Sequence, residues 1–270
     1  MDKKHYFEGW YYKQVTADEQ TAISFIPAVS LIDGDKHSFI QYIFVQTTET
    51  GEKSAHTGYV RYPIDQFHYQ QEPFVMQIGE SVFSEQLVSV QLHDEKMTIS
   101  GKLGLGDFHP IQTSLLQPSI MGFVGYIPRM ECYHGVISMT HTLQGSLSID
   151  GQEVDFTGGK GYLEKDWGTS FPQKYIWLQS NHFENPTASF FFSVVDVPVH
   201  ITTLEGFTSG YRTNAPAKCL KEPANRPEWK SWIMLKSNMQ SQLLYRAWKS
   251  LSTYCNRDSI SHSIHSQNPF

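Results

Sequence analysis

Two acids alternate with a lysine and a tryptophan in the short stretch YLEKDWG. If this stretch is a strand, Glu164 and Asp166 share one face of it, and Lys165 and Trp167 share the other, because side chains alternate along a strand. A carboxyl group buried among apolar groups keeps its proton at neutral pH and can donate it to a substrate. The stretch therefore predicts a proton donor beside an aromatic wall. A buried structural corner without a function is the alternative interpretation.

The next stretch, YIWLQSN, follows a turn at 168–172 and alternates in an unusual way. Trp177, Gln179 and Asn181 would share one face of the strand, with the aliphatic side chains on the other. A core face would carry the aliphatic residues, whereas a ligand pocket is mostly apolar with a few placed polar groups. The pattern favours the lumen of a ligand-holding barrel over an exposed edge with one tryptophan.

The run FEGWYYK near the start of the chain places Glu8, Trp10 and Tyr12 on one face of an expected strand. Taken alone, this run favours a strand that closes a sheet with Trp10 in the core, because large aromatic side chains usually pack inside.

A fourth run, MECYHG, would turn Glu131 and Tyr133 to one face and Cys132 and His134 to the other. A carboxyl group with a phenol nearby is a usable acid pair. A hydrogen-bonded polar pair at the rim of a barrel explains the run equally well.

Several classes of protein are excluded or disfavoured. The sequence has no GxxxxGK[ST], HExxH or GxSxG motif, and the net charge of −6 argues against nucleic acid as a partner. The twelve histidines show no ligand spacing, so no metal site is expected. No apolar run approaches about 18 residues, and we expect neither a membrane span nor a signal peptide. Three cysteines without a CxxC pair indicate a reducing cytoplasm.

The elements that must position these runs are strands. Apolar and β-branched segments are joined across Asp33-Gly34, across 93–96 and across Asp150-Gly151, which are hairpin signals. No convincing helix precedes residue 210. The pattern predicts an all-β fold of barrels or sandwiches, with a boundary in the Pro- and Gly-containing segment 117–128.

The last 60 residues differ in kind. Residues 211–270 hold nine basic and three acidic residues, whereas the preceding part is strongly acidic. Prolines break any strand there, and tryptophans and leucines follow a rough helical stripe. We expect an atypical, partly helical or disordered tail, and we interpret it as the product of a frameshift or a similar disruption.

Taken in order, these runs resemble the tocopherol cyclase family. The resemblance is carried by FEGWYYK at 7–13, SFIPAVS at 24–30, MECYHGVISMTH at 130–141, GGKGYLEKDWGTSFP at 158–172 and YIWLQSN at 175–181. Members of this family are similar to carotenoid hydratase and AttH-like proteins. The resemblance implies two lipocalin-like β-barrel domains, at 1–125 and 126–210, with the second incomplete and followed by the tail at 211–270.

The resemblance also implies a reaction, in which protonation of an alkene closes a chroman ring on a prenylated hydroquinone without a metal or a redox cofactor. Asp166 and Glu131 are the favoured acids and Glu164 a less favoured one. The expected substrate contacts are Glu8, Trp10, Tyr133, His134, Trp167, Trp177, Gln179 and Asn181, since a cation is stabilised by aromatic faces and the ring hydroxyls need polar partners.

Other functions remain open on the sequence. A lipocalin-like protein can bind an isoprenoid or another apolar ligand without chemistry, a related enzyme can hydrate an alkene, and a disrupted chain can be inactive. The expected partner is a small apolar or prenylated ligand. The expected location is the cytoplasm, with peripheral membrane contact open to the basic tail.

Overall fold

The computed structural model describes residues 5–48, 50–115, 119–121, 125–126, 128, 130–172, 174–199, 202–212 and 218–219; after residue 195 it describes the backbone only. The chain divides into two units, Met1–Phe171 and Pro172–Phe270, which are described separately.

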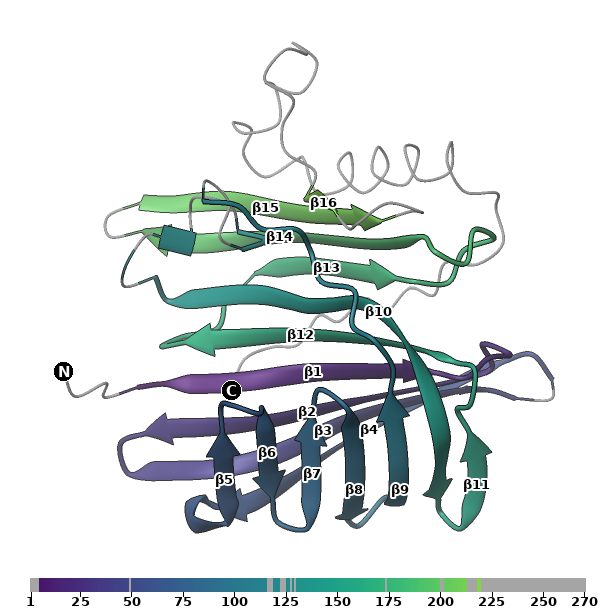
Figure 1. Cartoon of the computed structure of the whole chain (residues 1–270). Helices are drawn as coiled ribbons and strands as arrows, with labels where there is room; N and C mark the ends of the chain where they lie inside the picture. Colours follow the sequence, from purple (N-terminus) through teal and green to yellow (C-terminus); the bar gives the residue numbers. More distant parts are fainter. Residues whose placement is uncertain are drawn as a thin grey trace. The chain divides into compact units, whose positions relative to one another are not determined.

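The first unit contains twelve strands in one antiparallel sheet (Figure 1). The strand order is β4-β3-β2-β1-β12-β10-β9-β8-β7-β6-β5, and β11 pairs with β10. The bounds are β1 Phe7–Val15, β2 Thr21–Ile32, β3 Asp35–Thr47, β4 Lys53–Pro63, a 3-10 turn η1 Ile64–Gln66, β5 Phe67–Gln70, β6 Val75–Ile78, β7 Ser81–Ser84, β8 Leu87–His93, β9 Thr98–Leu105, β10 Cys132–Ile149, β11 Gln152–Asp155 and β12 Lys160–Gly168.

Tight turns join the hairpins where the sequence predicts them. Asp33-Gly34 connects β2 to β3 and Asp150-Gly151 connects β10 to β11. Gly34 and Gly151 have φ of 83° and 81°, in the left-handed region that a two-residue hairpin turn requires and that glycine adopts without a steric penalty.

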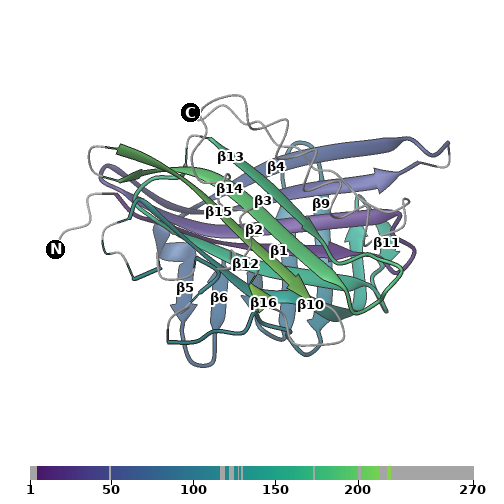
Figure 2. The same ribbon diagram turned by 90° about the horizontal axis from the view of Figure 1, so that it is seen from above.

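The core of the first unit lies between two groups of strands. The short strands β5–β9 run across the long strands β1–β4 (Figures 1 and 2), and alternate side chains of both groups pack together. Its fully buried members include Tyr12, Phe25, Ile40, Phe83, Leu92, Ile99 and Leu147. The long strand β10 and the central strand β12 extend this sheet, and the faces of these two strands that point away from the core carry the candidate site described below.

The second unit is a four-stranded antiparallel sheet of order β13-β14-β15-β16. Its strands are β13 Tyr175–Ser180, β14 Ser189–Val199, β15 Thr202–Arg212 and β16 Lys218–Cys219. No helix among the described residues is long and apolar enough to span a bilayer.

The predicted all-β class is confirmed, and the part of the chain that the structure describes contains no α-helix. The expected boundary near residue 126 lies inside the first unit, because β9 and β10 pair across it and β12 pairs with β1. Most of the predicted tail lies outside the described residues; 218–219 form β16.

Candidate proton-transfer site

The central strand β12 lies between β1 and β10, and its register sets the candidate site. His134 of β10 stands opposite Asp166, and Tyr11 of β1 stands opposite Glu164. Directly opposed residues of an antiparallel pair share a face. His134, Glu164 and Asp166 therefore share one face of the sheet, as the alternation of YLEKDWG predicts for the two acids.

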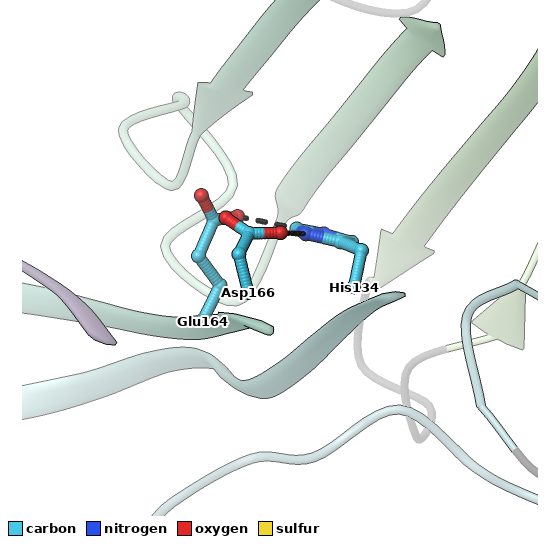
Figure 3. Close-up of side chains that lie close together, drawn as sticks. All are labelled: His134, Glu164 and Asp166. Atoms are coloured by element: carbon cyan, nitrogen blue, oxygen red, sulfur yellow. Dashed lines mark hydrogen bonds and ion pairs between the residues drawn. The ribbon is translucent and has the colours of Figure 1, made fainter. Parts of the chain in front are cut away.

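The imidazole of His134 faces the carboxylates of Glu164 and Asp166, which lie side by side on β12 (Figure 3). Its Nδ1 atom is 2.7 Å from Asp166 Oδ1, which is a hydrogen bond, and its Nε2 atom is 3.6 Å from Glu164 Oε2. The hydroxyl of Tyr162 donates a hydrogen bond of 2.5 Å to the same Glu164 oxygen. One β10 residue and three alternate β12 residues thus form a connected polar cluster.

This cluster is largely withdrawn from water. The side chains of His134, Glu164 and Asp166 are 17%, 7% and 24% exposed. Burial by itself would lower the pKa of His134, but the carboxylates of Asp166 and Glu164 outweigh it and raise that pKa to about 9. The imidazole is consequently protonated at neutral pH, and each of its N–H groups faces a carboxylate.

Three further residues on this face escaped the sequence analysis. Burial, reinforced by Glu164, holds the pKa of Tyr162 well above its usual range, so that Tyr162 remains a neutral donor. The Ser24 hydroxyl donates to the hydroxyl of Tyr11 at 2.9 Å. Burial lowers the pKa of Lys13 to about 8 against the attraction of Glu164.

A sequence signal for these residues exists. Tyr11 and Lys13 alternate with Trp10 in FEGWYYK, and Tyr162 stands two residues before Glu164. Considering both faces of each expected strand, and not only the face with the tryptophan, would have identified these residues.

The predicted aromatic residues lie on the opposite face of the sheet. Trp10 pairs in register with Lys165, and Tyr133 pairs with Trp167. The rings of Tyr133 and Trp167 stack at 5.6 Å with an interplanar angle of 12°. The Lys165 ammonium lies over Trp10 and Trp167 and pairs with Glu8. The structure therefore divides the predicted site residues of the first unit between two faces.

Glu131 precedes β10 and is held through its backbone. Its carbonyl accepts hydrogen bonds from the N–H groups of Thr169 at 2.7 Å and Ser170 at 3.1 Å. These bonds fix the turn after β12 against the start of β10. None of the described contacts joins the Glu131 side chain to this polar cluster.

The remaining predicted residues belong to the second unit. Trp177 and Gln179 lie on β13, and Asn181 follows it. Gln179 and Asn181 are buried, with 6% and 1% of their surfaces exposed, whereas Trp177 is half-buried.

The cluster has the donor set of a metal site as well. One nitrogen of His134 and one oxygen each of Glu164 and Asp166 lie within 4.8 Å of one another. Imidazole and carboxylate groups suit Zn²⁺, Mn²⁺ or Fe²⁺. His134 precedes Glu164 by 30 positions and Asp166 by 32, and no local pattern indicated this grouping.

Comparison with known proteins supports the resemblance. Residues 96–195 match the tocopherol cyclase-like family. A segment of 67 residues is 31% identical to the probable chloroplastic tocopherol cyclase of Oryza sativa subsp. japonica and to the chloroplastic tocopherol cyclase of Zea mays. That segment is 25% of this chain and 14% of the length of each plant protein.

Two solved structures are similar to this chain at low scores. CghA with Sch210972 has a TM-score of 0.49 at 10% identity, covering 83% of this chain and 62% of that one. Kievitone hydratase from Nectria haematococca has a TM-score of 0.46 at 11% identity, covering 83% and 67%. At these scores neither structure carries an argument about the site. The family match does, and it includes β10, β12 and β13: residues 96–195 of this chain are tocopherol cyclase-like.

Proposed function

We propose that the chain catalyses an acid-promoted cyclisation of a prenylated hydroquinone or a similar isoprenoid, and that the face with His134, Glu164 and Asp166 handles the proton. The observation that carries the proposal is the partly buried imidazole hydrogen-bonded to Asp166 at 2.7 Å beside a second carboxylate. The family match supports the reaction class.

The ligand-free cluster stores its proton on His134. An apolar substrate that covers the cluster removes water, and desolvation disfavours charged groups. The ion pair of His134 and Asp166 then converts to its neutral form when the proton moves from Nδ1 to Oδ1 along their hydrogen bond. Asp166 becomes a carboxylic acid in a dry site, which is the form that alkene protonation requires.

The chemical steps balance without a co-reactant. The proton of Asp166 adds to the less substituted carbon of the alkene, and a tertiary cation forms. A phenolic oxygen of the substrate adds to this cation and closes the ring. The phenolic proton returns to the Asp166–His134 pair, so the product is an isomer of the substrate. Glu164, which accepts the hydrogen bond of Tyr162, lies close enough to His134 to favour the return of the proton.

The test measures conversion of a prenylated hydroquinone without added cofactor, with the product identified by mass spectrometry. Cyclisation gives an isomer of unchanged mass that separates from the substrate by chromatography, hydration adds one water, and a binding protein returns the substrate itself. Asp166→Asn should reduce turnover by at least about 100-fold. The exposed Asp107 provides the control, since Asp107→Asn makes the same change away from the cluster. Wild-type turnover in Asp166→Asn would remove Asp166 from the mechanism.

A further inference from the structure

A pocket opens on the face of the first unit that the proton cluster does not use. Its volume is about 190 Å³. Tyr6, Trp10, Phe67 and Tyr69 supply aromatic walls, and Val29 and Leu31 of β2 supply aliphatic ones. This volume is several times the roughly 30 Å³ that one water molecule occupies in the liquid, so the pocket can accommodate a single small ring.

The aromatic wall is held in place by its own packing. Trp10 is 2% exposed, and its ring lies 5.9 Å from that of Tyr69 and 5.7 Å from that of Phe74. Phe67 stacks on Tyr69 at 6.5 Å with an interplanar angle of 12°. Tyr69, which is 44% exposed, is the most exposed of these rings. A pocket built in this way exists before a ligand arrives, which is typical of small-molecule sites.

One carboxylate, Glu8, provides the polar feature of the lining. It accepts a hydrogen bond from the hydroxyl of Tyr6 at one oxygen and pairs with the ammonium of Lys165 at the other. The ammonium lies 4.9 Å from the ring centre of Trp10. An ionised carboxylate offers about four lone-pair sites, so Glu8 keeps the capacity to accept from a ligand.

These charges define which ligands fit. Lys165 offsets the charge of Glu8, so the lining has no net charge that would attract an ion, and a neutral ligand leaves this ion pair in place. The aromatic walls favour a flat ring, which stacks or packs edge-to-face. A ring that carries a hydroxyl can also donate to Glu8.

The pocket and the proton cluster share no residue. Glu8 and Trp10 stand opposite Trp167 and Lys165, whereas Gly9 and Tyr11 stand opposite Asp166 and Glu164. Because successive side chains point to opposite faces, the two sets are separated by the sheet itself.

We propose that this pocket is a binding site for a small neutral aromatic alcohol of the phenol class, with its ring among Trp10, Phe67 and Tyr69 and its hydroxyl donating to Glu8. The site stands independently of the proposed function, because its residues lie on the other face of β1.

The experiment titrates phenol and toluene into the full chain, following the Trp10 indole signal by NMR and the heat by calorimetry. Phenol should bind with a Kd on the order of 1 mM, an affinity typical of a ligand of about seven non-hydrogen atoms. Toluene, which cannot donate to Glu8, should bind about tenfold more weakly.

Substitutions in and beside the pocket show where the two ligands bind. Leu31→Phe fills the pocket and should weaken both ligands at least about tenfold. Ile32→Phe is its matched control, since the neighbouring Ile32 is 41% exposed and does not line the pocket. Glu8→Leu should make the affinities for phenol and toluene equal, and a thermal melt shows whether this variant is folded.

Unchanged phenol binding in Leu31→Phe would overturn the proposal, as would equal affinities for phenol and toluene in the wild type. Phenol binding that disappears in Asp166→Asn but persists in Leu31→Phe would also overturn it, because the ligand would then occupy the proton cluster. Loss of cyclase turnover in Asp166→Asn with phenol binding retained supports two separate sites.

Discussion

The charged state of His134 makes the stability of the fold depend on pH in a way that Asp166 controls. The pKa of His134 is about 9 in the folded protein against 6.5 in the unfolded chain. The folded state therefore holds a proton that the unfolded state has lost between these values. The free energy of unfolding falls as pH rises there, by about 1.4 kcal/mol for each pH unit.

The titration of two other groups limits the pH range in which the effect of His134 can be measured. Burial lowers the pKa of Lys13 from 10.5 to about 8, so stability rises with pH between these two values and opposes the effect of His134. Burial lowers the pKa of His141 from 6.5 to about 3, so stability rises with pH below 6.5. Between about pH 6.5 and pH 8, the effect of His134 is the largest of the three, and the expected net loss of stability is about 1 kcal/mol.

The perturbation is Asp166→Asn, which keeps the shape of the side chain and removes its charge. The pKa of His134 should fall, because the Asp166 carboxylate is the largest cause that raises it. Urea unfolding at pH 6.5, 7.2 and 8 should then show a flatter dependence than the wild type, while Asp107→Asn should leave the slope unchanged. Equal slopes in the wild type and Asp166→Asn would refute the assignment of the proton to the His134–Asp166 pair.

Three further predictions concern the neighbourhood of the cluster. Tyr162→Phe removes the hydroxyl that bonds Glu164 and should destabilise the fold by about 1.5–3 kcal/mol in urea unfolding, and a change within about 0.5 kcal/mol would contradict the hydrogen bond. Gly161→Ala places a methyl group 2.1 Å from Nε2 of His141, so overpacking should lower stability by about 1–3 kcal/mol, and a variant as stable as the wild type would show that the imidazole moves aside freely. The ring of His141 itself should stay neutral down to about pH 4 in an NMR titration, since burial lowers its pKa to about 3; protonation near pH 6 would place it in a more hydrated environment.

The alternation of side chains along each strand was sufficient to predict which nearby residues share a face. The pairs Glu164 with Asp166 and Glu8 with Trp10 follow from the two-residue period of a strand, and the register agrees with both. The hairpin at Asp33-Gly34 follows from local turn chemistry in the same way.

The pairing of distant strands was not accessible from local pattern. Nothing in the sequence indicates that β12 lies between β1 and β10: β1 is more than 100 residues away in the chain, and the register that sets His134 opposite Asp166, 32 residues later, includes irregularities in β10. For this reason the meeting of His134 with Asp166 and the separation of Trp10 from both acids could not be predicted. The proline- and glycine-containing segment before β10 indicated a domain boundary, yet β9 and β10 pair in one sheet.

Because β12 serves a different set of side chains on each face, it responds very differently to two kinds of mutation. Substitutions at Glu164 or Asp166 can alter one surface and leave Lys165 and Trp167 in place, so each face can diverge separately during evolution or in a designed library. Deletion of one residue near the start of the strand would instead exchange the two faces throughout. We therefore expect a point change in this strand to affect one face and a single-residue deletion to affect both, a difference that can be scored directly in a deep mutational scan that includes single-residue deletions.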